Sequence, residues 1–318
     1  MIKANKIAKT RPVNKTEGET LVKRIWDYRE MYLMLIPSLI YVFIFAYIPM
    51  YGIIIGFQDM NIGDTYGQST WVGLHHLKRF FEGIWIGTLL RNTLLITAIG
   101  ALLGIPFNLG LALLLHNSTN KYIKKLVQSL TYVPNLLSLV LLVGIVNLFV
   151  DREGGLINIV RSAMGYEKFD FYATVAPFLP MYFISGIWQS TGAGAIIYIG
   201  ALAGVDEEMV EAARIDGAGK LRIIWNIQLP SIKPTVVTTM IMNFGAVFGV
   251  GADKVLLMQS PLNVEISEVI STYVYKSGVV QARYSFSTAV GLFQNVCNIA
   301  MLAIVNFIAD RLTGMGIM

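Results

Sequence analysis

A polar segment between two apolar runs carries the residues best suited to contact another molecule. It extends over residues 204–234 and reads GVDEEMVEAARIDGAGKLRIIWNIQLPSIKP. Glu211 and Arg214 offer charged contacts to a partner, or to each other, since residues three apart on a helix are neighbours. Ala212 and Ala213 have small side chains, so a partner surface could approach the helix closely at these positions. These residue types support docking, and we expect no catalytic residue in the chain.

Local signals predict a short helix over the first part of this segment. Asp206 can cap its start, because an aspartate side-chain oxygen accepts a free backbone N–H of the first turn. Two glutamates follow at the positive end of the helix dipole. The helix is expected to run to about Ile215 and to stop at Asp216 and Gly217, where glycine can adopt the left-handed conformation.

A second short helix is expected over residues 221–229. It should end at Pro230, because proline lacks an N–H and its ring clashes with a preceding carbonyl. A helix of about nine residues is marginal alone in water. The first helix therefore needs support, and the residues alone leave two interpretations: a helix lying on the membrane surface, or a helix docked on a partner.

The composition favours a bilayer as the solvent of this chain. Of its 318 residues, 55% are hydrophobic and 14% are charged, with a mean hydropathy of +0.59. A soluble domain usually carries about 25% charged residues. The net charge of +5 could indicate nucleic-acid binding, but many cations lie in a polar arm, which is typical of a cytoplasmic flank. The single cysteine, Cys297, excludes an internal disulfide and a CxxC motif.

Six apolar segments can each cross a membrane, since about 20 helical residues span the hydrocarbon core. We predict an all-α membrane protein with a cytoplasmic arm over residues 1–30 and a transmembrane domain over residues 31–318. The first apolar run is too long for a signal peptide, so we expect an uncleaved helix. The predicted spans are residues 31–57, 92–115, 126–150, 177–200, 234–252 and 286–309, with a long loop at 204–233. Small residues one turn apart favour close helix packing, as in Gly100/Gly104, Gly200/Gly204 and Gly245/Gly249.

The distribution of charge predicts the orientation. With the N-terminus inside, the cytoplasmic segments hold 16 Lys and Arg and the outer loops hold 9, as the positive-inside tendency requires. We therefore expect a multi-pass protein of the bacterial plasma (inner) membrane with both termini cytoplasmic. No predicted span contains a charged residue, which argues against a proton-driven carrier. His75, His76 and His116 fall in loops without zinc-ligand spacing, so we expect them to be solvated or interfacial and expect no metal site.

The loop motif resembles a known family. Glu211-Ala212-Ala213, then Gly217, then Ile227 and Pro230 are similar to the EAA motif of binding-protein-dependent ABC import permeases. Residues 187–188 and 194–198 resemble carbohydrate-uptake permeases. Residues 154–158, 267–275 and 288–293 resemble the LplB- and YtcP-like subgroup of that family. The resemblance covers roughly residues 92–310.

This resemblance implies a six-helix permease with a cytoplasmic EAA coupling helix. It implies that the permease couples ATP hydrolysis on a separate subunit to alternating access for an oligosaccharide, with acidic fragments of alginate or pectin among the candidates. The implied partners are a second homologous permease, a cytoplasmic ATP-binding subunit dimer and an extracytoplasmic solute-binding protein. The residues implied to dock on the ATPase are Glu211, Ala212, Ala213, Arg214, Asp216 and Gly217.

The chain itself lacks a nucleotide-binding motif. A phosphate-binding loop needs GxxxxGK[ST], and the nearest match is Gly219-Lys220. Arg214 stands five residues before this glycine and Leu221 follows the lysine, so the phosphate cradle cannot form. We expect no cofactor on this chain, with ATP and Mg on the partner ATPase.

A sugar path needs hydrogen-bonding groups and flat apolar faces on which sugar C–H groups can stack. Asn and Gln side chains in membrane helices commonly form hydrogen bonds with neighbouring helices. Each polar candidate could therefore hold two helices together instead of contacting sugar. The favoured path residues are Trp188, Gln189, Asn243, Phe244 and Asn147, with Asn108, Asn135, Phe248, Gln294 and Asn298 as further candidates.

Two other functional hypotheses for the chain are an ion-coupled secondary transporter or channel, and a membrane scaffold without transport.

Overall fold

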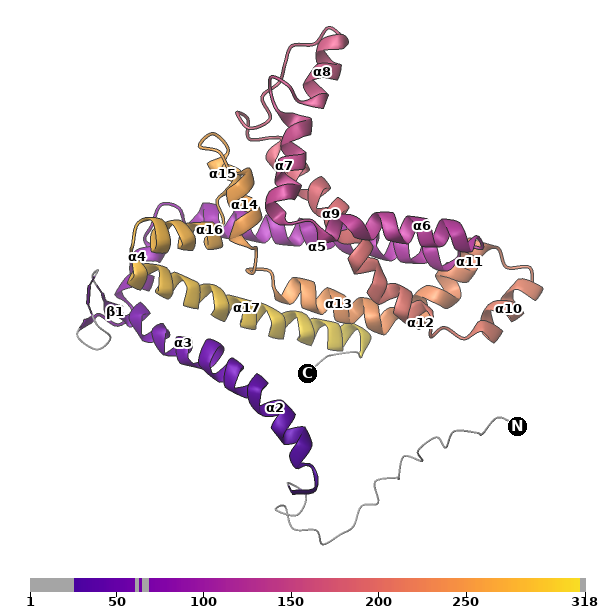
Figure 1. The fold of residues 1–318 in the computed structure, drawn as a ribbon, viewed down its shortest axis with the longest axis horizontal. Coiled ribbons are helices and arrows are strands. Elements are labelled where there is room, and N and C mark those ends of the chain that lie inside the picture. Colours follow the sequence, from indigo (N-terminus) through magenta and orange to yellow (C-terminus); the bar gives the residue numbers. More distant parts are fainter. Residues whose placement is uncertain (1–25, 61–62, 65–68, 315–318) are drawn as a thin grey trace, which may run out of the picture. The chain divides into compact units, whose positions relative to one another are not determined.

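The computed structural model describes residues 26–60, 63–64 and 69–314, and these residues are mainly helical (Figure 1). Most of the basic arm predicted over residues 1–30 lies outside them. The strands among the described residues are β1 (Gln58–Asp59) and β2 (Thr70–Trp71), which pair antiparallel. The predicted all-α class is confirmed.

The chain divides into two compact units, residues 1–53 and 54–318. The described part of the first unit contains α2 (Arg29–Val42), the π-helical segment η1 (Phe43–Tyr47) and α3 (Ile48–Met50), followed by the 3-10 segment η2 (Tyr51–Phe57). No residue of α2, η1 or α3 is buried, although the run is strongly apolar. A helix that is apolar on all sides suits a lipid environment.

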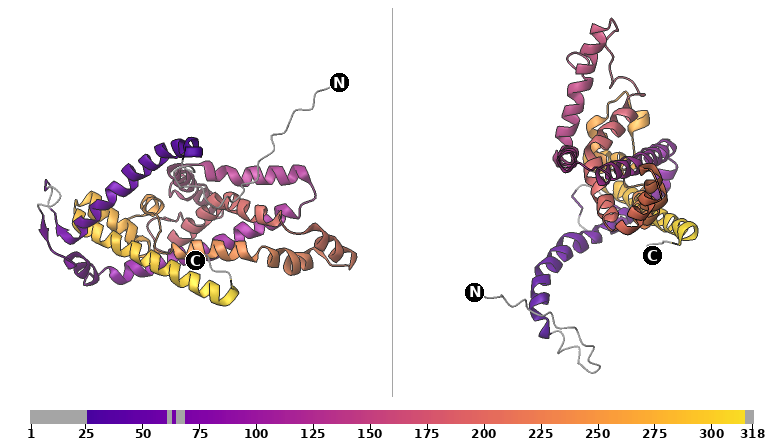
Figure 2. Two further views of the ribbon diagram at one scale, coloured as in Figure 1. Left: turned by 90° about the horizontal axis from the view of Figure 1, so that it is seen from below. Right: turned by 90° about the vertical axis from the view of Figure 1, so that its right-hand side faces the viewer.

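Four helices lie side by side in the second unit (Figures 1 and 2). They are α5 (Ile86–His116), α9 (Phe178–Leu202), α13 (Lys233–Gly245) and α17 (Tyr284–Thr313). By length and composition, three stretches of the described residues could each cross a membrane alone: 29–57, 86–116 and 284–311. The count of six spans therefore stays a prediction.

The predicted third span is broken in the structure. Residues 121–136 contain α6 (Lys121–Tyr132) and η3 (Val133–Leu136), and α7 (Leu139–Val150) leaves them at an angle of 104°. The break has two local causes. Pro134 stands at the start of η3, and Ser138 caps α7 by accepting the Leu141 N–H at 3.3 Å.

The close approaches between helices occur mostly at glycines outside the predicted pairs. A Cβ on Gly192 of α9 would lie 2.0 Å from the Thr131 carbonyl oxygen of α6. A Cβ on Gly245 would likewise lie 2.4 Å from the Leu302 side chain of α17, which fits the predicted packing role of Gly245. Gly104 and Gly200 have nothing within 4 Å, so the predicted pairs that contain them are not close contacts in this chain.

The predicted outer segment after α13 is folded rather than a loose loop. It contains α14 (Ala252–Met258), α15 (Val264–Ser267), α16 (Ile270–Tyr275) and the π-helical segment η5 (Lys276–Val280). The other helices are α4 (His75–Phe81), α8 (Leu156–Ala163), α10 (Glu207–Ile215), α11 (Lys220–Ile223), the π-helical η4 (Ile224–Gln228) and α12 (Leu229–Ser231).

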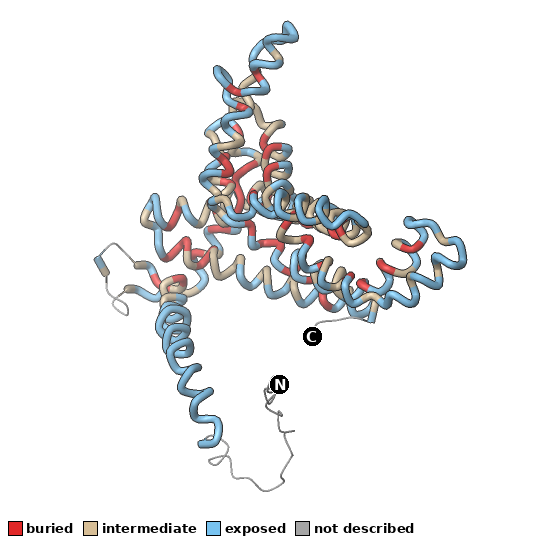
Figure 3. The backbone as a smooth tube through the Cα atoms, turned by 45° about the vertical axis from the view of Figure 1, so that its right-hand side comes forward, coloured by how far each residue is buried: buried red, intermediate tan, exposed pale blue. Residues whose placement is uncertain are grey.

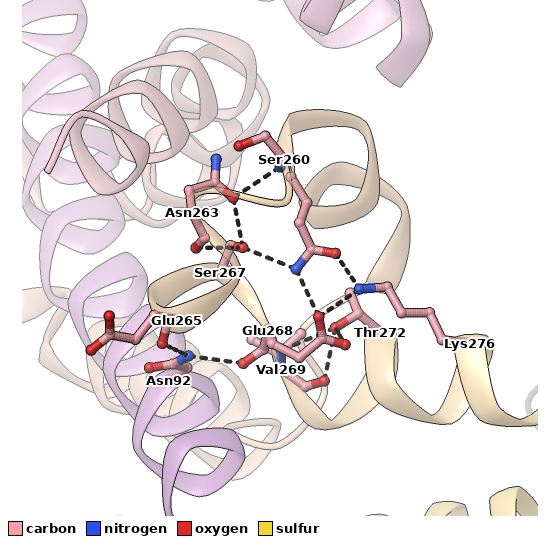
Figure 4. Close-up of polar contacts among 10 residues, drawn as sticks. Asn92, Ser260, Asn263, Glu265, Ser267, Glu268, Val269, Thr272 and Lys276 are labelled. Carbon is pink, nitrogen blue, oxygen red and sulfur yellow. Dashed lines mark hydrogen bonds and ion pairs between the residues drawn. The ribbon is translucent and has the colours of Figure 1, made fainter. Parts of the chain in front are cut away.

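A buried ion pair holds this outer segment together (Figure 4). The Glu268 carboxylate is 5% exposed and accepts from Lys276 Nζ at 2.6 Å and from Gln259 Nε2 at 2.9 Å. Asn92 of α5 donates to the backbone carbonyls of Glu265 at 3.0 Å and Glu268 at 2.9 Å. The segment is thus tied to α5, and the buried charge has its counter-ion.

Replacing Lys276 with methionine is expected to destabilise this segment, because Glu268 would keep a buried charge without its cation. We expect the free energy of unfolding of this segment to fall by about 1–3 kcal/mol. This is less than the roughly 3–5 kcal/mol lost when a fully buried ion pair is broken, because Lys276 is partly exposed. Hydrogen exchange of amides 252–280 measures the effect. The double variant Lys276→Met/Glu268→Gln should recover protection, and equal exchange in all three proteins would contradict the assignment.

The histidines differ from their predicted environments in one case. His76 is buried, and its Nε2 donates to the Gln58 carbonyl at 3.1 Å, so the expectation that it is solvated or interfacial was wrong. The β1–β2 hairpin covers this side of α4 and could not be read from the spacing of the sequence. His75 is exposed, and His116 ends α5 in a half-buried position.

Candidate functional site

The predicted docking helix forms as its local signals indicate. It is α10, and the Asp206 Oδ1 accepts the Glu208 N–H at 2.9 Å. At its other end Gly217 has φ +79, the left-handed conformation. The Gly217 N–H donates to the Arg214 carbonyl at 3.1 Å and the Ala218 N–H to the Ala213 carbonyl at 2.8 Å. This is a Schellman motif, in which two carbonyls at the helix end are satisfied.

No residue of α10 is buried within this chain (Figure 3). Glu211, Ala212 and Arg214 are exposed, Ala213 is half-buried, and Asp216 and Gly217 after the helix are exposed. Ile215 is 87% exposed although it is large and apolar. A nine-residue helix without buried contacts has little stability of its own. This exposure is what a surface that docks on another molecule requires.

The second short helix does not end at Pro230 as predicted. Helix α11 continues through the π-helical segment η4 and then α12, which ends at Ser231. The wider π turn directly before the proline relieves the clash of its ring with the preceding turn. The Ile227 carbonyl accepts from the Ser231 hydroxyl at 2.7 Å, so a side chain serves the backbone there.

An amide pair links this second helix to the end of α5. Asn117 Nδ2 donates to Gln228 Oε1 at 2.9 Å, and Gln228 Nε2 donates to Asn117 Oδ1 at 3.0 Å. Gln228 is 2% exposed, so the pair is made away from water. Sequence analysis did not single out either residue. The available signal was a glutamine inside the apolar run IWNIQLP, where a buried amide needs a partner.

A polar cavity of about 480 Å³ lies beneath α10. Its lining includes His116, Lys124 and Glu207, together with Glu211 and Arg214. The helix therefore stands off the ends of α5 and α6, with charged groups of both signs between them.

The predicted path residues occupy different environments. Trp188 is 45% exposed and lines an apolar cavity of about 570 Å³ between α7, α8 and α9, and it is the only one of the five favoured residues in that lining. Gln189 Nε2 reaches the Leu137 carbonyl at 3.4 Å. Asn147 is exposed and accepts from the Tyr172 hydroxyl at 2.5 Å. The contact of Trp188 and Asn147 with a sugar stays a prediction.

The remaining favoured residues lie on α13. Asn243 is exposed, and its Nδ2 donates to the Thr239 carbonyl of its own helix at 2.7 Å. Phe244 is half-buried one residue later. This bond lies within one turn and uses only the amide N–H of the Asn243 side chain. Both residues stay predictions for the path.

Two of the further candidates, Asn298 and Gln294, support the backbone of a third, Phe248, just after α13 ends. The Phe248 N–H donates to Asn298 Oδ1 at 2.8 Å, and Gln294 Nε2 donates to the Phe248 carbonyl. Asn298 and Gln294 both belong to α17. Non-helical backbone in a membrane protein needs such partners when it is buried in protein. These side chains therefore have a structural role, the alternative that the sequence left open.

Lys254, two residues beyond the predicted fifth span, was not among the residues predicted from the sequence. Helix α14 packs against α7 and α9, and Lys254 Nζ donates to the Tyr182 carbonyl of α9 at 2.8 Å. The ammonium also lies 4.5 Å from the centroid of the Tyr182 ring. Burial lowers the pKa of Lys254 to about 8. The sequence signal was a lone lysine two residues beyond an apolar run.

Comparison with known proteins extends these observations. Residues 100–314 match the family model described as the binding-protein-dependent transport system inner membrane component. The chain is 38% identical to the protein LplB of Bacillus subtilis, with 88% of each chain covered. It is 36% identical to the polygalacturonan/rhamnogalacturonan transport system permease protein YteP of Bacillus subtilis, covering 95% of this chain and 94% of that one.

A solved structure is also similar. It is a bacterial alginate ABC transporter in complex with an alginate pentasaccharide-bound periplasmic protein. The TM-score is 0.85 with 30% sequence identity, and the match covers 94% of this chain and 100% of that chain. The similarity in fold therefore extends over most of the chain.

Proposed function

Since this chain belongs to the family of binding-protein-dependent transport system inner membrane components, we propose that it is the permease subunit through which an acidic oligosaccharide enters the cell. The family is that of ABC importers, so the chain is a non-catalytic, multi-pass inner-membrane subunit. It works with a periplasmic binding protein and with ATPase subunits on separate chains.

The acidic character of the substrate is supported by two relatives of different kinds. The permease YteP is described for polygalacturonan and rhamnogalacturonan, and the similar solved transporter binds alginate through its periplasmic protein. Each of these polymers carries carboxylates on its sugar units. The single observation that carries the proposal is the 36% identity to YteP over 95% of this chain.

The mechanism follows from the exposed docking helix. We propose that α10 docks on the ATPase through Glu211 and its neighbours, that ATP and Mg bind the ATPase, and that closure of the ATPase dimer moves the membrane helices. A second, homologous permease completes the pathway, and both termini lie in the cytoplasm. The support is the exposure of α10 and its connection, through α11 and Gln228, to the end of α5.

Uptake by a reconstituted complex tests the substrate proposal. The permease pair, ATPase and cognate binding protein are placed in proteoliposomes, and uptake of labelled tetragalacturonate or tetramannuronate is measured with ATP inside and outside the vesicles. We expect ATP-dependent uptake of at least one of these uronides that is at least tenfold above uptake of neutral galactan and arabinan tetramers. Uptake of only the neutral tetramers would refute the acidic substrate, and uptake independent of ATP would refute the importer.

A further inference from the structure

Two lysines of the outer segment differ in how their charges are balanced. Lys276 lies 2.6 Å from a Glu268 carboxylate oxygen, so its charge is neutralised within the fold. Lys254 is half-buried, and its ammonium donates to a backbone carbonyl, that of Tyr182. Among the described residues, no carboxylate forms an ion pair with Lys254. A cation that is partly removed from water without an ion-pair partner is costly, so Lys254 calls for an explanation.

The neighbouring helix is shaped to admit the ammonium. A Cβ on Gly186 would lie 3.1 Å from Lys254 Nζ, so the absence of a side chain there leaves room for the cation. Tyr182, Gly186 and Gln189 follow one another at positions i, i+4 and i+7 of α9 and lie on one face. All three are half-buried, so this face is not sealed by the chain itself. Lys254 therefore stands beside a polar stripe on α9.

The bonds that Lys254 makes leave capacity for a ligand. An ammonium has three N–H donors, and one of them is used by the Tyr182 carbonyl. The ring of Tyr182 beneath the cation contributes a favourable cation–π contact without neutralising the charge. A carboxylate would supply both an acceptor and the missing negative charge. Such charge-assisted bonds are roughly twice as strong as neutral ones.

We propose that Lys254, held beside Tyr182 and Gly186, binds the carboxylates of the oligosaccharide as it passes α9. This inference rests on the proposed function and names the group in the permease that reads the acidic substrate. Gln189, one turn further along the same face, can bond sugar hydroxyls. The two neighbouring sequence candidates therefore lie in different places: Gln189 on the polar stripe of α9 and Trp188 at the apolar cavity.

Variants of Lys254 test the proposal in the complete reconstituted complex. Lys254→Met should lower the maximal uptake of tetragalacturonate, or of whichever uronide the wild type carries, at least tenfold. Lys254→Arg should keep more than half, because it retains the charge. Lys78→Met is the matched control, since Lys78 is an exposed outer lysine, and it should equal the wild type. Basal ATP hydrolysis and complex yield should be the same in all four proteins.

A readout of substrate charge separates recognition from structural support. Uptake of a carboxyl-methylated form of the same oligosaccharide is measured at concentrations that saturate the binding protein. Lys254→Met should leave uptake of the methylated form within twofold of the wild type. If the wild type does not carry the methylated form, the uptake of the unmethylated uronide by Lys254→Arg decides between recognition and structural support. Equal losses on both forms, failure of Lys254→Arg to rescue, or poor assembly of Lys254→Met would overturn the inference. Wild-type failure to carry any uronide would instead refute the proposed function.

Discussion

Replacing Gly217 with valine should abolish the stimulation of ATP hydrolysis by substrate-loaded binding protein while the permease still inserts. Gly217 has φ +79, and a β-branched residue in that conformation is a genuine outlier. The left-handed conformation costs an ordinary residue roughly 1–2 kcal/mol. Helix α10 has no buried residue to offset this cost, so its end would unwind or change direction. We expect stimulated ATP hydrolysis to fall at least tenfold.

The matched variant at this position is Gly217→Asn, since asparagine adopts the left-handed conformation more readily than other non-glycine residues. It should keep most of the stimulation. A charge reversal, Glu211→Lys, tests the contact itself without altering the helix end, and Glu167→Lys, at an exposed position away from α10 in the sequence, is its control. Full stimulation in both Gly217→Val and Glu211→Lys would show that α10 does not dock on the ATPase.

Replacing Gly192 with alanine should be the most destabilising glycine-to-alanine substitution in the membrane helices. The new Cβ would lie 2.0 Å from the Thr131 carbonyl oxygen and 2.7 Å from the Tyr132 nitrogen. Both are backbone atoms, so no side chain can rotate away, and α6 and α9 have to separate. Overpacking typically costs about 1–3 kcal/mol, and we expect the upper part of that range or more. The thermal midpoint of the purified permease and its monodisperse yield report the loss.

Gly200→Ala provides the comparison within the same helix. Gly200 has no atom within 4 Å of its built Cβ, and alanine is the better helix former. Its thermal midpoint should equal or exceed that of the wild type. If Gly192→Ala behaved like Gly200→Ala, the backbone contact between α6 and α9 would not exist in the membrane.

Several features of this protein were determined by short stretches of sequence. The start of α10 at Glu207 and its end at Ile215 follow from Asp206 and Gly217, because a cap bonds backbone groups only two to five residues away. The membrane class follows from composition, since a chain with 14% charged residues has too few polar groups for a water-soluble fold. The absence of a phosphate-binding loop was equally plain, because that motif is contiguous.

The partners of individual residues were decided only by the tertiary structure. Gly192 and Gly200 are both glycines of α9. A Cβ on Gly192 would meet the α6 backbone and a Cβ on Gly200 would meet no atom within 4 Å, because the difference depends on where a second helix passes. Lys254 reads as an outer-loop lysine until α14 packs against α9 and brings its ammonium to Tyr182. Local bonds are set by neighbours along the chain, whereas the contact of Lys254 depends on Tyr182, 72 residues earlier, and the one-dimensional pattern does not encode that pairing.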